Sequence, residues 1–227
     1  MSRLFAIIPA RSGSVGVPDK NIAIVGGMPL LVRTYRVARS LPLDVRVIVS
    51  TDSTHYLSLL RKEGYHDQTL RPTELASSGA LVINTILHEL ARVNAAEDDL
   101  VTLLEPSFFG GRSANLNLAI ERVCDGQADS CFGVYAVPTA FHHAKQFERD
   151  GDLTRRVGLQ VNVNRQDLPP AYVRSGEFYL SRVGLVRAEL SMYGGRLSMF
   201  ETAQPFVNID NAEDMQRAMR IAEGVAD

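Results

Sequence analysis

Cysteine and tryptophan are scarce in this sequence. Its 227 residues include two cysteines, Cys124 and Cys131, and no tryptophan. Neither cysteine belongs to a pair with the spacing of metal ligands, so no cysteine-based metal site is indicated. We expect both side chains to be reduced thiols with a structural role, as is usual in a cytoplasmic protein.

Long apolar runs and a large excess of charge are also lacking. The formal net charge is −2, so no global field would recruit nucleic acid or an anionic membrane. No apolar run approaches the roughly 20 residues that a membrane helix needs. The first residues lead into a predicted strand without the charged start, apolar core and cleavage site of a signal peptide. We therefore expect no nucleic acid partner, no membrane association and a cytoplasmic location.

What is present is the composition of an ordinary globular protein, with 45% hydrophobic and 22% charged residues. The length suits one domain, residues 1–227. Apolar strands and amphipathic helices alternate. We expect strands at 4–8, 45–50, 100–104, 130–137, 176–181 and 206–209, and helices at 28–41, 54–63, 81–94, 114–123 and 214–222. This alternation favours an α/β fold with a mostly parallel sheet covered by helices on both faces, which binds ligands beyond the carboxyl ends of its strands.

The alternation stops after Pro138. The following residues to Pro170 are polar and show weak periodicity. We interpret residues 138–175 as a small element that protrudes from the sheet and serves in dimerisation or sugar binding. It contains His142 and His143, but adjacent residues of an extended segment point to opposite sides. A structural or interface role is therefore favoured over a shared metal.

A short basic loop follows the first predicted strand. After Pro9, Gly13 and Gly16 let backbone amides turn toward an anion, and Arg11 and Lys20 add fixed positive charge. This suits a nucleoside triphosphate, whose phosphate charges must be neutralised at one place. The loop follows neither the Walker pattern nor the dinucleotide fingerprint. The alternative interpretation is a surface turn rich in glycine and serine.

Residues 9–21 resemble the opening motif of the cytidylyltransferases that activate acidic sugars, above all of the CMP-N-acetylneuraminate synthetase type. That motif reads Pro-Ala-Arg-Gly-Gly-Ser-Lys-Gly-Ile-Pro-x-Lys-Asn, and this sequence differs from it at Ser12, Val15 and Val17. Further blocks of resemblance follow in order through nearly the whole chain. The resemblance implies a three-layer Rossmann-like nucleotidyltransferase fold and a homodimer. It also implies transfer of CMP from CTP to an acidic α-keto sugar, sialic acid-like or Kdo-like, with release of pyrophosphate.

The resemblance assigns roles to the loop and to two later segments. Arg11 and Lys20 are expected to hold the phosphates as catalytic residues. The residues expected to line the phosphates are Ser12, Gly13, Ser14 and Gly16. Asn21 and Arg71 are expected to contact the nucleoside, since Arg71 begins a sequence similar to the family's Arg-Pro-x-x-Leu-Ala. An exposed loop arginine is the alternative for Arg71. The Ser-Thr-Asp-Ser sequence at 50–53 is interpreted as an N-cap cluster for the next helix.

Three further positions are expected to bind substrate. Glu105 stands where the family has a glutamine, and a carboxylate accepts hydrogen bonds where an amide both donates and accepts. Arg165 matches an arginine that could bind the sugar carboxylate through a two-pronged contact, with a surface ion pair as the alternative. Ser175 replaces an asparagine of the same block with a smaller hydrogen-bonding group.

The expected cofactor is Mg²⁺, and the expected metal residues are Asn208 and Asp210. The family has Asp-Ile-Asp here, on a strand where alternate residues face the same way. Mg²⁺ prefers oxygen ligands and bridges to phosphate, so Asp210 could hold it with triphosphate oxygens and water despite the neutral Asn208. One alternative is a catalytically impaired member that binds nucleotide or dimerises with an active partner. Another is an enzyme for a different nucleotide or a non-sugar acid.

Overall fold

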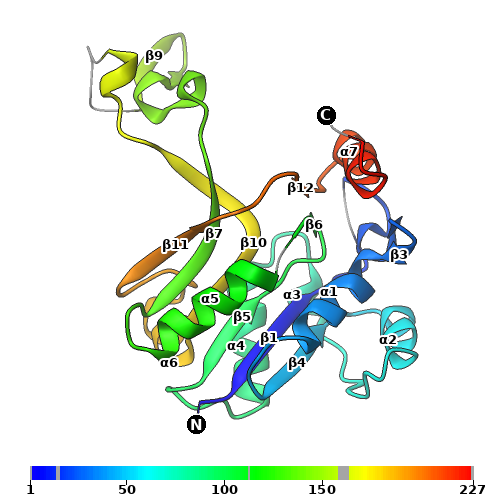
Figure 1. Cartoon of the computed structure of the whole chain (residues 1–227). Helices are drawn as coiled ribbons and strands as arrows, with labels where there is room; N and C mark the ends of the chain where they lie inside the picture. Colours follow the sequence, from blue (N-terminus) through cyan, green and yellow to red (C-terminus); the bar gives the residue numbers. More distant parts are fainter. Residues whose placement is uncertain (1, 14–15, 112, 158–163, 226–227) are drawn as a thin grey trace.

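The computed structural model describes residues 2–13, 16–111, 113–157 and 164–225 (Figure 1). Its centre is a six-stranded sheet with the order β11-β7-β10-β5-β1-β4. These strands are β1 (Leu4–Pro9), β4 (Val45–Ser50), β5 (Leu100–Leu103), β7 (Ser130–Ala136), β10 (Tyr172–Arg182) and β11 (Leu197–Glu201). β1 runs parallel to β4 and β5, and β7 runs parallel to β11. The sheet is thus mostly parallel, as predicted, but β10 is antiparallel to both its neighbours.

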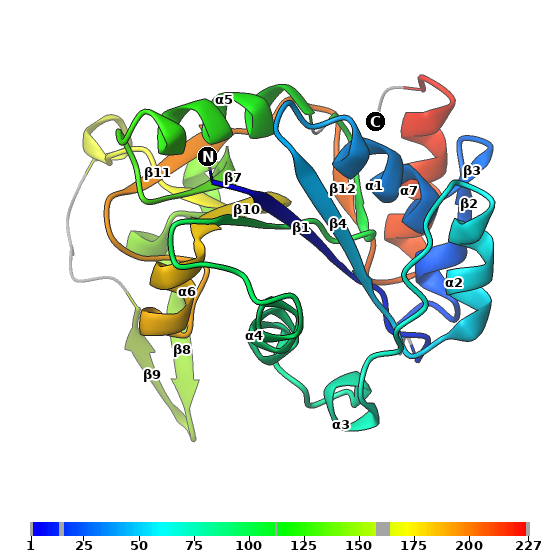
Figure 2. The same cartoon turned by 90° about the horizontal axis from the view of Figure 1, so that it is seen from below.

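Helices cover both faces of the sheet, and β1 shows why. Because successive side chains of a strand point to opposite faces, its buried residues divide into two sets. Leu4, Ala6 and Ile8 pack in a cluster with apolar side chains of α1 (Leu30–Arg39) and α5 (Ser113–Cys124). Phe5 and Ile7 pack with α4 (Val82–Arg92) and α6 (Val183–Glu189). Figure 2 shows the two pairs of helices on opposite sides of the sheet, which confirms the three-layer fold.

Helix ends follow their capping residues. α2 (Thr54–Arg61) begins after Ser53, whose hydroxyl accepts a hydrogen bond from the amide of Tyr56, so the predicted N-cap is confirmed at this position. α7 (Ala212–Ala222) begins two residues before the predicted start, because Asn211 and Asp214 form a capping box. Elements without a sequence prediction include β2 (Ile24–Val25), α3 (Thr73–Ala76), β6 (Phe108–Phe109) and β11, whereas β3 (Met28–Pro29) occupies the start of the helix predicted at 28–41. β6 pairs with β12 (Val207–Asn208), which is shorter than the predicted strand.

The predicted protrusion is present. β7 and β10 lead away from the sheet to the hairpin of β8 (Phe147–Asp150) and β9 (Leu153–Arg156), seen at the upper left of Figure 1. His142 lies buried at its base. Its Nδ1 accepts the amide proton of Ala144 at 3.1 Å, so Nε2 carries the proton and donates to the carbonyl of Pro169 at 3.1 Å. His142 therefore has a structural role and links the start of this element to its end.

Two further expectations concern the described part of the chain as a whole. No helix there has the length and apolar character needed to span a membrane. Cys124 is exposed and Cys131 is buried, and both are free thiols. Burial raises the pKa of Cys131 to about 11, so this thiol remains protonated at neutral pH.

Candidate active site

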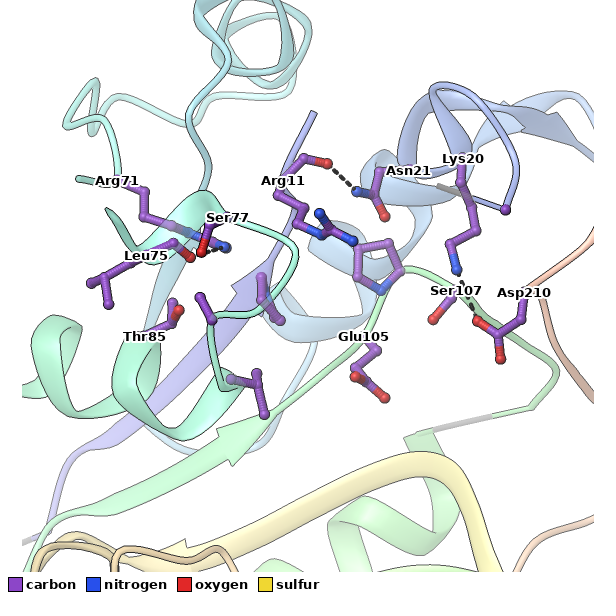
Figure 3. Close-up of a pocket in the computed structure, with 15 residues that line it drawn as sticks. Arg11, Lys20, Asn21, Arg71, Leu75, Ser77, Thr85, Glu105, Ser107 and Asp210 are labelled. Carbon is purple, nitrogen blue, oxygen red and sulfur yellow. Dashed lines mark hydrogen bonds and ion pairs between the residues drawn. The ribbon is translucent and has the colours of Figure 1, made fainter. Parts of the chain in front are cut away.

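A cavity of about 320 Å³ lies beyond the carboxyl ends of β1 and β5, where a parallel sheet is expected to bind its ligand. Figure 3 shows residues from four separate segments around it, with the guanidinium of Arg11 between Arg71 and Lys20 in this view. The predicted site residues that line it are Arg11, Gly16, Lys20, Asn21, Arg71, Glu105 and Asp210. The fold therefore brings the loop at 11–21 together with Arg71, Glu105 and Asp210, which lie far apart in sequence.

The loop after β1 is held against the segment before α7. A Cβ on Gly16 would lie 2.0 Å from the carbonyl oxygen of Asp210, so only glycine permits this approach. The Lys20 ammonium donates to the carbonyl of Ile209 at 2.6 Å and contacts Asp210 Oδ1 at 3.0 Å. Buried Asn21 donates from Nδ2 to the Arg11 carbonyl at 2.9 Å. These contacts place Lys20 and Asp210 on one side of the cavity.

Ser12 is bound to the neighbouring strand end. Its amide and its hydroxyl both donate to the Asp52 carboxylate, each at 2.8 Å. Burial alone would raise the pKa of Asp52, but the hydrogen bonds from Ser12, that from the Asp52 amide and the charge of Arg71 together lower it. Ser12 and Gly13 lie outside the lining that the described residues form. Ser14 falls outside the described residues.

Arg71 is a buried residue that lines the cavity, and not an exposed loop arginine. Its side chain donates from Nε to the Ser50 hydroxyl at 3.0 Å and from the guanidinium to the Ser50 carbonyl. Its amide donates to the Thr51 carbonyl at 2.8 Å, which fixes the backbone beside β4. Burial lowers the pKa of Arg71, yet a guanidinium remains charged in a protein. Arg71 therefore brings a permanent positive charge to the cavity.

Glu105 lies where three cavities meet. It lines the first cavity, a second of about 370 Å³ and a third of about 250 Å³. The second cavity shares Ser107 and Asp210 with the first, and the third contains mostly apolar side chains. Arg174 and Tyr179 line both the second and the third cavity. A ligand larger than a nucleotide could thus extend past Glu105 without leaving the cleft.

Asn208 and Ser175 lie side by side next to the second cavity. The Asn208 amide donates to the Ser175 carbonyl at 2.6 Å. A Cβ on Gly176 would lie 2.5 Å from Asn208 Oδ1, so Gly176 leaves room for this side chain. Asn208 lines the second cavity, whereas the Ser175 side chain is fully buried, accepts a hydrogen bond from the Glu177 amide at 3.2 Å and lies 2.6 Å from the Thr202 hydroxyl. The backbone of Arg165 lies in a short 3-10 helix of the protrusion, and its side chain is outside the described part of the structure.

The donor atoms near Asp210 suit a metal that is shared with a substrate. Its carboxylate leaves 77% of the side-chain surface exposed, and Glu105 opens into the same two cavities. Mg²⁺ is commonly held by one or two carboxylates together with phosphates and water. No group of three or more histidine, cysteine or acidic residues with metal-binding geometry occurs among the described residues. The protein alone thus offers a partial oxygen site, which fits Mg²⁺ that arrives with phosphates.

Some lining residues were not predicted from the sequence. The polar ones are Ser77, Thr85 and Ser107. Ser107 follows the carboxyl end of β5, and this position relative to a strand is the signal that could have found it. Ser77 directly follows α3, and Thr85 lies in the first turn of α4. Both line the cavity because the chain between α3 and α4 passes beside it.

Comparison with known proteins finds similarity to cytidylyltransferases. A family model described as cytidylyltransferase matches residues 5–101. The N-acylneuraminate cytidylyltransferase of Streptococcus agalactiae serotype V is 26% identical over 211 residues, which are 92% of this chain and 50% of that protein. The chain thus spans about half the length of this relative. The CMP-N,N'-diacetyllegionaminic acid synthase of Legionella pneumophila is 25% identical over 196 residues, 84% of this chain and 83% of that protein.

Solved structures show the same fold. A CMP:2-keto-3-deoxy-manno-octonic acid synthetase complexed with CTP superimposes with a TM-score of 0.70 at 16% identity, over 98% of this chain and 99% of that chain. A 4-diphosphocytidyl-2C-methyl-D-erythritol synthase superimposes with a TM-score of 0.59 at 14% identity, over 98% and 99% of the two chains. The motif after β1 and the matches over most of its length make this chain similar to the cytidylyltransferases that activate acidic sugars.

Proposed function

We propose that this protein transfers CMP from CTP to an acidic α-keto sugar, either sialic acid-like or Kdo-like, and releases pyrophosphate. The observation that carries this proposal is the cavity beyond β1, where Arg11, Lys20 and Arg71 converge from separate segments. Three positive side chains at one cavity can neutralise much of the negative charge of a triphosphate. The similarity to cytidylyltransferases of acidic sugars supports cytidine as the base and an acidic sugar as the acceptor.

Positioning and charge neutralisation are the contributions of the chain. In the proposed reaction the acceptor hydroxyl attacks the α-phosphorus of CTP, and its proton passes to solvent water. The new bond joins that oxygen to phosphorus, and the bond to the pyrophosphate oxygen breaks. Arg11 and Lys20 stabilise the negative charge that develops on the phosphates, since fixed charges in a cavity need no reorganisation. Asn21 and Arg71 orient the nucleoside, and Gly16 keeps the loop close to Asp210.

The acceptor is proposed to bind in the second cavity, which adjoins the first at Glu105, Ser107 and Asp210. The Glu105 carboxylate accepts hydrogen bonds and therefore selects acceptor groups that donate them. Arg165 is proposed to bind the acceptor carboxylate. Asp210, with the amide oxygen of Asn208, is proposed to hold Mg²⁺, which when bound supplies further positive charge to the phosphate oxygens.

We also propose a homodimer that forms through the protrusion. Phe141 and Phe147 expose 67% and 62% of their surface there, and Tyr172 exposes 40%. Apolar side chains exposed together on one small element are a common mark of a protein interface. Light scattering after size exclusion should give twice the mass of the chain, and Phe147→Asp should reduce it to the mass of one chain. An unchanged dimer in that variant would exclude this surface.

The activity is tested by release of pyrophosphate from CTP and Mg²⁺ with sialic, legionaminic, pseudaminic and 3-deoxy-octulosonic acids in turn. Release with one of them, lost in Lys20→Ala, is the expected result and identifies the acceptor class. CTP binding without release from any acid would instead support a nucleotide-binding or dimer-partner protein. Absence of CTP binding would contradict the proposed function in either form.

A further inference from the structure

Helix α4 carries a buried carboxylate directly behind the cavity. Only 3% of Glu89 is exposed, and the residue does not belong to the lining formed by the described residues. Its Oε1 accepts a hydrogen bond from the Ser50 hydroxyl at 2.6 Å, and its Oε2 contacts Arg92 Nε at 2.7 Å. Arg92 also pairs with Asp67 at 2.9 Å. A charge is costly to bury, so a buried carboxylate with these partners calls for a reason.

The direction of these hydrogen bonds leads from Glu89 to the cavity. A carboxylate paired with arginine accepts hydrogen bonds and donates none, so the Ser50 hydroxyl must donate its proton to Glu89. The lone pairs of that hydroxyl are then turned to Arg71, whose Nε donates to it at 3.0 Å. The Ser50 carbonyl accepts a second N–H of the same guanidinium. Glu89 thus fixes the orientation of the Ser50 hydroxyl, so that its oxygen accepts the hydrogen bond from Arg71.

Charge leads to the same conclusion. Arg71 is 7% exposed, and burial acts against its charged form. Asp52 and Glu89 are the carboxylates that favour the charge, whereas Arg11 across the cavity opposes it. Among the described residues the side chain donates three hydrogen bonds, two to Ser50 and one to the Leu75 carbonyl at 3.4 Å. A guanidinium has five N–H groups, so two remain for a ligand of the cavity.

We propose that Glu89 is a positioning residue: acting through Ser50, it aims the buried guanidinium of Arg71 at the nucleotide in the cavity. This inference rests on the proposed function, because it needs a nucleotide that Arg71 contacts. It assigns to the first residue of the segment at 50–53 a role different from helix capping, which belongs to Ser53. Glu89 itself touches neither substrate nor reacting atoms.

The test is CTP affinity, measured by calorimetry with Mg²⁺ and without an acceptor, for Glu89→Gln. Glutamine keeps the size of the side chain but removes its charge and can donate to Ser50, which frees the hydroxyl to turn away from Arg71. We expect CTP binding to weaken about tenfold, which is about 1.4 kcal/mol. In steady-state assays KM for CTP should rise while kcat changes less than about twofold. In an Arg71→Ala background, Glu89→Gln should change affinity less than about twofold, because the two residues act as a unit.

Asp99→Asn is the matched control. Asp99 is also a buried carboxylate, 4% exposed, and it pairs with Arg3 at 2.7 Å, beside the first residues of β1 and β5 at the other end of the sheet. This variant should lower the melting temperature and leave CTP affinity unchanged. If loss of stability alone weakened binding, both variants would bind CTP less tightly, and the positioning role would be refuted.

Other outcomes separate this inference from the proposed function. Wild-type affinity in Glu89→Gln would overturn the inference while CTP binding itself stands. No CTP binding by the wild type would overturn both. If Glu89→Gln fails to fold, Ser50→Ala removes only the hydroxyl between the two charges and should weaken CTP binding about threefold to tenfold. Unchanged affinity in Ser50→Ala would then refute the positioning role.

Discussion

Substitution of Gly16 by alanine tests whether the close contact between the first loop and the Asp210 segment is required for activity. An alanine Cβ would lie 2.0 Å from the Asp210 carbonyl oxygen and 3.2 Å from its carbonyl carbon. Side-chain carbons essentially never approach a heavy atom within 3.0 Å, so the two segments must separate by about 1 Å. The Cβ is fixed to the backbone of residue 16 and meets a backbone carbonyl, so no flexible side chain can move aside instead.

This separation would displace Lys20 and Asp210, which are proposed catalytic residues. Lys20 donates to the carbonyl of Ile209 and pairs with Asp210, so movement of either segment misplaces the ammonium and the carboxylate together. A misplacement of about 1 Å at an active site can lower the rate about 100-fold. We therefore expect kcat/KM for CTP to fall about 100-fold in Gly16→Ala, which corresponds to about 2.7 kcal/mol of transition-state stabilisation. The Mg²⁺ concentration for half-maximal activity should rise as well, because Asp210 moves.

The assay is pyrophosphate release, with the melting temperature measured in parallel. Gly111→Ala is the control, because among the described residues no heavy atom beyond its chain neighbours lies within 4 Å of a Cβ at that glycine, and it should keep activity within about twofold. A Gly16→Ala enzyme that stays folded and within about threefold of wild-type activity would refute the reasoning. The loop would then be able to yield without moving Lys20 or Asp210.

Three other predictions concern the metal site, an ion pair and the core. Asn208→Asp supplies a second carboxylate and should lower the Mg²⁺ concentration required for pyrophosphate release severalfold. Without metal the same variant should have a lower melting temperature, because an ionised carboxylate cannot donate a hydrogen bond to the Ser175 carbonyl. Hydrogen bonds from the Arg196 side chain lower the pKa of Asp129 from 3.8 to about 2, so this carboxylate stabilises the fold above pH 4 and loses that effect as the pH falls toward 2. The difference in urea midpoint between wild type and Asp129→Asn should therefore be constant from about pH 5 to 7 and shrink below about pH 4; a constant difference down to pH 2 would contradict the assignment. Phe178→Ala removes a fully buried ring from β10 and should cost about 3–5 kcal/mol of unfolding free energy in denaturant titrations, whereas a cost below about 1 kcal/mol would mean that the core refills the space.

Local sequence patterns predicted many of the strands and helices. The apolar run of β1, the helical spacing in α4 and the β-branched run of β4 each predicted an element close to its observed position, since periodicity and burial act within a few residues. The two-residue strand β6 has no such pattern, and β12 is only the middle of the strand predicted at 206–209, because the two pair only where residues 108 and 208 meet. The direction of a strand could not be predicted from local sequence either. β10 has the pattern of any buried strand, and it runs antiparallel to its neighbours because of the path of the chain through the protrusion.

The site shows the same division. By itself the sequence determined the loop of Arg11, Gly16 and Lys20 and the order of the later motifs, because these depend on residue type and spacing near a strand end. Only the tertiary structure decided that Gly16 touches the Asp210 backbone and that Ser50 leads from Glu89 to Arg71. The segment at 50–53 is the clearest case: Ser53 caps a helix as its local sequence suggests, whereas Ser50 bonds Arg71 and Asp52 bonds Ser12. Such contacts join residues many positions apart, so they exist only once the sheet has brought its strand ends together.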